Sequence, residues 1–188
     1  MNRRNALSAV AAIVGGSIIG AEAFLSGCKT PAKKEGLFST DDIAMLDEVG
    51  ETILPTTASS PGAKSTKIGE FMKTIVTDCY DEKEQKIFED GLVKLQAASN
   101  KKFSKDFIDL DATQRHDLLV ELDKEAKDYM KSKKPDDPTH YFTMIKQLTL
   151  WGYFTSEAGA TKALRYVAVP GRYEGCIPYK KGDKAWAT

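Results

Sequence analysis

Residues 139–154 read THYFTMIKQLTLWGYF, and no other segment with helical spacing is as apolar. The segment follows a charged loop, residues 131–138, that contains two prolines and ends a preceding helix. We expect it to form a helix that belongs largely to the core. Its large apolar side chains are those of Tyr141, Phe142, Ile145, Leu148, Leu150, Trp151 and Tyr153.

Four more segments repeat apolar residues at steps of three and four, as an amphipathic helix does. They begin after Ser39, near Ile68, after Asp81 and after Asp111. The last carries a capping box, and Leu54-Pro55 ends the first. We expect Cys79 and Met130 to lie on apolar faces. Because no series of period-two runs bounded by turns occurs, the fold class is all-α: a bundle of about five or six helices with an irregular C-terminal segment packed on it, in one domain, residues 38–188.

The segment from residue 150 to residue 179 mixes glycine, proline and aromatic residues with little periodicity. Such a segment must pack on its own domain or on another chain. Aromatic residues and arginine are enriched in the cores of protein–protein interfaces. Both interpretations remain open, and the candidate contact set comprises Trp151, Tyr153, Phe154, Arg165, Tyr166, Arg172 and Tyr173.

The N-terminus has the three parts of an export signal: a basic start, an apolar stretch and small residues before a cut site. The residues Leu25-Ser26-Gly27-Cys28 resemble a bacterial lipobox, which predicts a signal over residues 1–27, lipidation of Cys28 and a tether over residues 28–37. The pair Arg3 and Arg4 resembles a twin-arginine signal, although an ordinary basic start is also compatible. We expect a lipid-anchored protein on the periplasmic side of a bacterial membrane. An uncleaved membrane helix and a soluble secreted product are the alternatives.

The composition excludes some classes of partner and leaves the state of the cysteines open. The 188 residues contain 27 basic and 27 acidic side chains, so no basic excess points to nucleic acid. Besides Cys28 there are two cysteines, Cys79 and Cys176. In an oxidising compartment they would pair as a disulfide, whereas the alternative is two separate buried thiols.

Few residues are of the kind that performs catalysis. His116 lies among charged residues and is expected to face solvent, and His140 stands at the start of a helix. Neither has the spacing of a metal site. The sequence contains no Cys-x-x-Cys-His, no Gly-x-Gly-x-x-Gly after a strand and no Gly-x-Ser-x-Gly. We therefore predict no catalytic, metal or cofactor-binding residues in this chain.

Several runs resemble the gluconate 2-dehydrogenase subunit 3 family. They are residues 150–159 (LWGYFTSEAG) with Tyr166 and residues 170–176 (PGRYEGC), supported by residues 52–56 (TILPT) and residues 78–80 (DCY). The resemblance extends from roughly Phe38 to Tyr179, nearly the whole chain after the signal.

This resemblance implies a non-catalytic small subunit. Its large partner would be an FAD-dependent dehydrogenase of the glucose–methanol–choline type that oxidises sugars, sugar acids or polyols, and a cytochrome c with haem would accept the electrons. The small subunit would carry the export signal for both proteins and stabilise the large subunit. The lipobox at Cys28 departs from the plain cleaved signal of the family and would tether the complex to the membrane. An independent lipid-anchored domain that binds a carbohydrate or a protein is the alternative, and an enzyme in its own right is a third.

Overall fold

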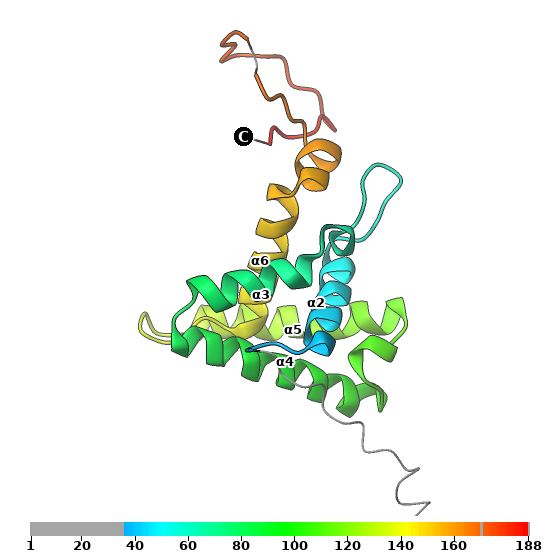
Figure 1. Ribbon diagram of the computed structural model, residues 1–188, viewed down its shortest axis with the longest axis vertical. Helices are drawn as coiled ribbons and strands as arrows, with labels where there is room; N and C mark the ends of the chain where they lie inside the picture. Colours follow the sequence, from blue (N-terminus) through cyan, green and yellow to red (C-terminus); the bar gives the residue numbers. More distant parts are fainter. Residues whose placement is uncertain (1–35, 170, 188) are drawn as a thin grey trace, which may run out of the picture. The chain divides into compact units, whose positions relative to one another are not determined.

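Helix α6 (Tyr141–Thr155) lies at the centre of the fold, in a computed structural model that describes residues 36–169 and 171–187. It contacts α2, α3, α4 and α5, and its C-terminal end projects past them (Figure 1). Eight of its fifteen residues are buried, as expected of a helix this rich in apolar side chains at the centre of a bundle. The buried residues of α6 are Tyr141, Phe142, Met144, Ile145, Leu148, Thr149, Gly152 and Tyr153.

Four amphipathic helices surround α6: α2 (Thr40–Ile53), α3 (Ile68–Cys79), α4 (Glu82–Phe103) and α5 (Ala112–Ser132). Two short 3-10 helices, Ala63–Thr66 and Phe107–Asp109, lie in the connections. Together these elements confirm the predicted all-α bundle. Among the described residues there is no strand, and the single β-bridge joins Arg165 to Trp186. Nor could any helix of this part span a membrane.

Capping boxes start three of the helices where the sequence places them. Ser39, Asp81 and Asp111 each accept a hydrogen bond from the backbone N–H three residues later. The side chain of that third residue in turn accepts from the cap backbone, so two N–H groups that have no partner inside the helix are satisfied.

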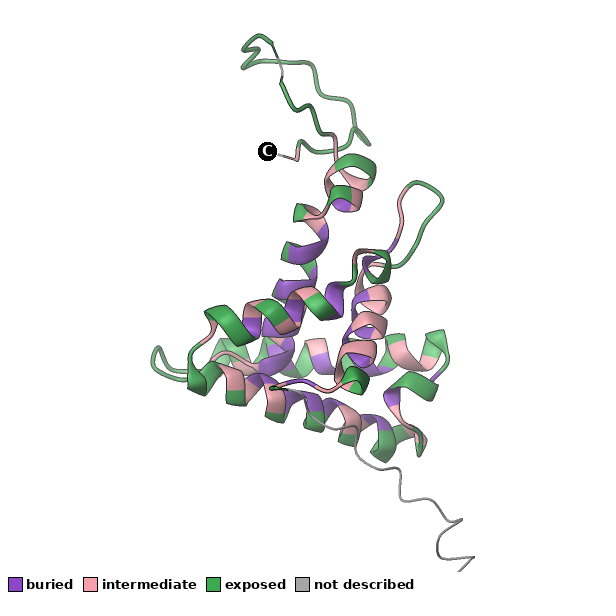
Figure 2. Ribbon diagram, in the orientation of Figure 1, coloured by how far each residue is buried: buried purple, intermediate pink, exposed green. Residues whose placement is uncertain are grey.

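Two side chains assigned to inward faces lie outside. Cys79 is exposed on the last turn of α3, and Met130 is exposed near the end of α5. Both predictions were wrong because they extend an apolar stripe to the end of its helix, where no neighbouring helix covers it. Figure 2 shows that buried residues gather where the helices meet α6. The core includes Phe88, Phe107, Phe142, Ile68 and Leu46.

After α6 a π-helical turn, η3 (Gly159–Ala163), leads into an irregular segment. We call the described residues 164–169 and 171–187 the C-terminal arm. The arm is exposed almost throughout, and none of its side chains belongs to the core or packs against it (Figure 2). We expected the irregular C-terminal segment to pack on the bundle. It does so only as far as Ala163, which contacts the core, and the arm that follows does not.

Candidate partner interface

Trp151 is the outward-facing aromatic residue of α6. Its side chain is 52% exposed, and its ring meets that of Phe71 on α3 edge to face, with ring centroids 5.5 Å apart. Such a pair favours a fixed ring orientation. The two rings thus form a rigid apolar surface on the outside of the bundle.

Gly152 explains how α3 comes so close to α6. A Cβ atom at this position would lie 2.5 Å from both Ile68 Cδ1 and Phe71 Cδ1. Only a residue without a side chain leaves room for that contact. The glycine therefore sets the position of Phe71 beside Trp151.

Tyr153 belongs to the core, contrary to its place in the candidate contact set. It is 3% exposed, and its hydroxyl donates a hydrogen bond of 2.6 Å to the carbonyl oxygen of Pro61. A step of two residues along an α-helix is a rotation of about 200° around the helix axis, so Tyr153 points inward whereas Trp151 points outward. Phe154 is half-buried against Tyr153, with ring centroids 5.1 Å apart.

The run Ser156-Glu157-Ala158-Gly159 ends α6 and turns the chain. The Ser156 hydroxyl accepts a hydrogen bond of 3.0 Å from the Gly159 N–H and donates one of 2.6 Å to the Tyr153 carbonyl. A Cβ atom on Gly159 would lie 1.9 Å from that same carbonyl oxygen. The serine and the glycine together therefore direct the chain into η3 and the arm.

Arg165 holds the two ends of the C-terminal arm together. Its N–H donates to the Ala185 carbonyl at 2.8 Å, and its own carbonyl accepts from the Ala187 N–H at 3.0 Å. The guanidinium carbon lies 3.9 Å from the ring centroid of Trp186, a close cation–π contact. We call this set of contacts the latch.

The other candidates lie between the ends of the arm and are exposed. Tyr166 is half exposed and Tyr173 is 95% exposed, while the Arg172 guanidinium pairs with Glu174 at 2.9 Å. The structure thus brings Trp151 and Phe154 together on α6 and places Arg165, Tyr166, Arg172 and Tyr173 on the arm.

Sequence reasoning missed Trp186, Tyr179, Val169 and Phe71 as members of this surface. Val169 is 82% exposed and Tyr179 is 78% exposed. Aromatic residues continue past Tyr173 to position 186, and that density is the signal that could have found two of them. Phe71 has the spacing of a core residue, so nothing local distinguishes it.

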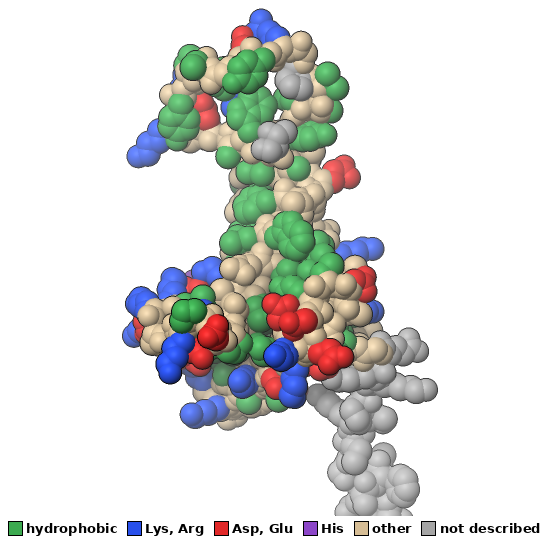
Figure 3. All heavy atoms as spheres, turned by 90° about the vertical axis from the view of Figure 1, so that its left-hand side faces the viewer, with side chains coloured by type: hydrophobic (Ala, Val, Ile, Leu, Met, Phe, Trp, Pro, Cys, Tyr) green, Lys and Arg blue, Asp and Glu red, His purple; other side chains and the backbone are tan. Residues whose placement is uncertain are grey.

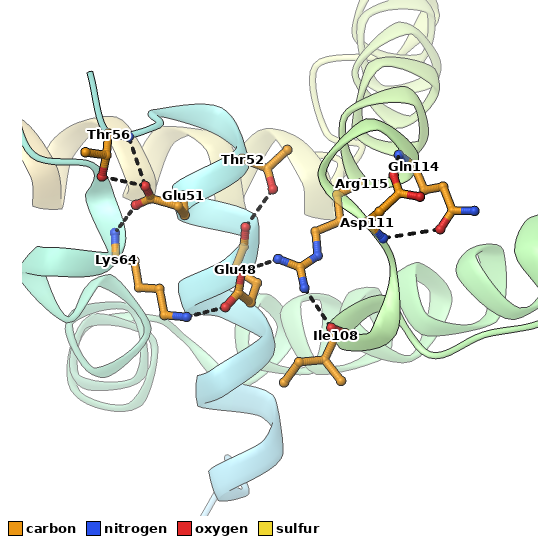
Figure 4. Close-up of polar contacts among 9 residues, drawn as sticks. All are labelled: Glu48, Glu51, Thr52, Thr56, Lys64, Ile108, Asp111, Gln114 and Arg115. Carbon is orange, nitrogen blue, oxygen red and sulfur yellow. Dashed lines mark hydrogen bonds and ion pairs between the residues drawn. The ribbon is translucent and has the colours of Figure 1, made fainter. Parts of the chain in front are cut away.

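A second cluster of charged side chains is structural (Figure 4). Glu48 on α2 pairs with both Lys64 and Arg115, which joins α2 to the following loop and to α5. The Arg115 guanidinium also donates to the Ile108 carbonyl at 2.7 Å. Glu51 accepts hydrogen bonds from the backbone N–H groups of Thr56 and Lys64, so it orders the same loop.

A pocket of about 220 Å³ lies between α2, α5 and α6. Asp123 on its wall forms ion pairs of 2.6 Å with Lys127 and with Lys146. Hydrogen bonds from these two ammonium groups lower the pKa of the Asp123 carboxyl, although its burial opposes them. The remaining lining residues are Thr52, Ile53, His116, Leu119, Val120 and Phe142.

The two histidines play different parts. His116 is solvent-facing, as expected, whereas His140 is largely buried and caps α6 by accepting at Nδ1 from the Phe142 N–H. Burial lowers the pKa of His140, and the nearby Glu125 carboxylate only partly opposes this. No group of three or more metal-ligating side chains occurs in the part of the chain that the structure describes.

Cys79 and Cys176 are both exposed free thiols in the structure. The predicted bond between them is therefore not formed there, and the alternative of two buried thiols is wrong. Cys79 ends α3, and Cys176 lies on the exposed arm. Cys28, Arg3 and Arg4 lie outside the described residues.

Comparison with known proteins identifies one family. The family model described as Gluconate 2-dehydrogenase subunit 3 matches residues 40–171, which is more than two thirds of the chain. The match begins at the first residue of α2 and extends into the arm. No curated protein and no solved structure matches the chain.

Proposed function

Because the chain belongs to the gluconate 2-dehydrogenase subunit 3 family, we propose that it is the non-catalytic small subunit of a membrane-associated, FAD-dependent dehydrogenase. The family description itself names a subunit of a dehydrogenase complex. In our proposal the large subunit is of the glucose–methanol–choline type and oxidises sugars, sugar acids or polyols. A cytochrome c accepts the electrons, and the small subunit supports the export, stability and tethering of the large one.

One observation carries the role of a partner subunit. Trp151 and Phe71 form a rigid aromatic surface at the projecting end of α6, and the aromatic residues of the arm follow directly in sequence. Soluble monomers rarely expose contiguous apolar surface of this kind, and where they do it usually binds another molecule.

A co-expression experiment tests this association. The chain would be produced with a flavoprotein of the proposed type and purified by a tag on either subunit. Replacing Arg172 and Tyr173 together by alanine should reduce co-purification and leave the helix content by circular dichroism unchanged, because both side chains lie on the exposed arm. If the wild-type chain does not co-purify with the flavoprotein, the proposed function fails.

The export role rests on the pair Arg3 and Arg4 in the predicted signal. FAD binds a folded protein in the cytoplasm, so a large subunit without its own signal needs a route for folded proteins and a partner that carries the signal. Arg3→Lys with Arg4→Lys should retain both subunits in the cytoplasm, whereas Lys33→Arg with Lys34→Arg in the tether should not. An active, flavin-loaded large subunit in the periplasm of cells without this chain would refute the escort role.

The tethering role depends on Cys28. The variant Cys28→Ala should lose incorporation of labelled palmitate and release the complex from the membrane fraction into the soluble fraction. If the wild-type chain incorporates no palmitate, or if the variant remains membrane-bound, the lipid anchor is refuted while association with the large subunit is unaffected.

The alternative of an independent binding domain has less support. The pocket of about 220 Å³ lies below the roughly 300–1,000 Å³ that is typical of small-molecule sites. Its charged wall residues Asp123 and Lys146 already neutralise each other. The exposed arm therefore favours a protein partner over a small ligand.

A further inference from the structure

We propose that the C-terminal arm is a preformed closed loop, held by the latch of Arg165 and Trp186, that docks on an apolar surface of the large subunit bordered by carboxylates. This inference rests on the proposed function and specifies how the partner is bound. The evidence comes from the latch, from the composition of the arm, from its charge and from its unpaired backbone.

The latch closes the arm across about twenty residues. Besides the backbone pair and the stacking of Arg165 on Trp186, the Lys184 ammonium donates to the Lys162 carbonyl in η3. A turn near the end of the arm is fixed as well, since the Asp183 carboxylate accepts from the Lys180 N–H at 3.1 Å. The two ends of the arm are therefore fixed before any partner binds, which lowers the entropic cost of docking.

Between its fixed ends the arm has little internal packing. No backbone group of residues 166–169 or 171–179 forms a hydrogen bond with another described residue. Val169, Tyr173 and Tyr179 are each more than three quarters exposed. Figure 3 shows hydrophobic side chains on the arm and along α6 beneath it. The arm thus adds exposed apolar side chains to the exposed Trp151 of α6.

The arm is also rich in basic side chains, although the chain as a whole is balanced. Residues 164–187 contain five basic and two acidic side chains, while the formal net charge of the whole protein is zero. One arginine pairs with Glu174, and the lysines 180, 181 and 184 are exposed. Complementary charge steers association and fixes orientation, so we expect carboxylates beside the docking surface.

The unpaired backbone favours a protein over a lipid bilayer as the occupant. Hydrocarbon offers no hydrogen-bonding partner, so an extended segment with free N–H and C=O groups would enter it only at a large cost in free energy. A protein surface can supply these partners along with the apolar contact.

Charge reversal in the full complex tests the docking surface. Lys180→Glu and Lys181→Glu together should raise the dissociation constant for the large subunit by at least about tenfold and flatten its dependence on salt, and they leave the Lys184 contact with the Lys162 carbonyl in place. The control Lys83→Glu with Lys124→Glu changes the same charge on exposed positions of α4 and α5, where the structure gives these lysines no ion pair. It should stay within about twofold of the wild type.

The contribution of the latch is tested separately, by variants of Arg165 and Trp186. Trp186→Ala and Arg165→Ala should each weaken association, and the double variant should weaken it no more than either alone, because the two residues act as one unit. Trp186→Phe should restore part of the affinity, since a phenyl ring still accepts the guanidinium on its face. Circular dichroism should stay at the wild-type value in all of them.

The outcomes separate the two proposals. If the wild-type chain binds the large subunit and the arm variants bind equally well, the docking arm is refuted and the subunit function stands. If the wild-type chain does not bind at all, the subunit function fails. If the arm variants keep their affinity for the large subunit but lose binding to vesicles of anionic phospholipid, the arm is a membrane contact and our inference is overturned.

Discussion

At the scale of single residues, His140 links the stability of the protein to pH. Its Nδ1 accepts the capping hydrogen bond at 3.2 Å, which requires that nitrogen to be unprotonated. The groups that face the ring are Glu125, with Oε1 3.7 Å from Nε2, the more distant Lys94, and the rings of Tyr129 and Tyr141. Burial outweighs the carboxylate, so the pKa of His140 in the folded state is below its value of 6.5 in the unfolded chain.

The sign of the pH dependence follows. Between about pH 6.5 and the lower pKa of the folded state, the unfolded chain binds a proton at this position that the folded chain does not, so the free energy of unfolding falls as the pH drops through this range. Replacing His140 by Asn keeps an acceptor for the cap and removes the titration. Urea unfolding at pH 7.5 and at pH 5.5 should show a smaller loss for this variant than for the wild type. An equal loss in both would assign the pH dependence to other groups.

Among the charged side chains, Glu48 is the one whose removal should lower the free energy of unfolding most. Its side chain is 15% exposed and is shared by Arg115 and Lys64. Glu48→Ala leaves the Arg115 guanidinium largely buried without its carboxylate, which should lower the free energy of unfolding by about 2–3 kcal/mol. Lys64→Ala is the matched control, and its cost should be below about 1 kcal/mol because the Lys64 side chain is more than half exposed. Equal losses in the two variants would contradict this assignment.

At the scale of the elements, Gly91 determines how closely α4 approaches α6. A Cβ atom there would lie 2.4 Å from Tyr141 Cβ, which is buried at the start of α6. Burial also raises the pKa of the Tyr141 hydroxyl to about 12. The Cβ atom added at position 91 and the Cβ atom of Tyr141 are each held directly by the backbone, so neither can rotate away from the other.

Gly91→Ala should therefore destabilise the protein although alanine is the better helix former. In an open helix the substitution would raise the free energy of unfolding by roughly 0.5–1 kcal/mol, whereas overpacking here should lower it by about 1–3 kcal/mol. Val93→Ala on the exposed side of the same helix should change it by less than about 0.5 kcal/mol. A more stable Gly91→Ala variant in thermal unfolding would show that the two helices separate easily.

The elements also show what sequence can predict. The helices were predictable because local signals define them: a capping residue, a regular apolar spacing and, after α2, a proline. The outward orientation of Trp151 beside the inward Tyr153 was not predictable, because large apolar residues occur on both the buried and the exposed side of the last turns of α6, and the choice depends on where α3 lies. The closeness of α3 depends in turn on Gly152, whose role appears only when both helices are in place.

At the scale of the whole molecule, the bundle and the arm should behave as separable parts. A chain that ends at Arg165 keeps Ala163, which contacts the core, and removes side chains that do not. Its free energy of unfolding should stay within about 0.5 kcal/mol of the wild type, measured by urea unfolding with circular dichroism. A larger loss would mean that the arm packs on the helices in solution.

The arm marks the limit of prediction from sequence for the whole molecule. Its aromatic residues and arginines indicated contact with something, but the sequence could not say whether that was the bundle or another chain. Trp186 shows why: its partner is Arg165, twenty-one residues earlier, and nothing local in either residue predicts the contact.

The unpaired backbone of the arm has a consequence for the fate of the subunit in the cell. Proteases cleave extended, exposed chain far more readily than helices, and residues 166–169 and 171–179 are of that kind in the free protein. A partner that covers the arm would shield it from cleavage. Subunits made in excess would then be degraded while assembled ones survive, so the arm would match the amount of this chain to the amount of its partner without any dedicated regulator.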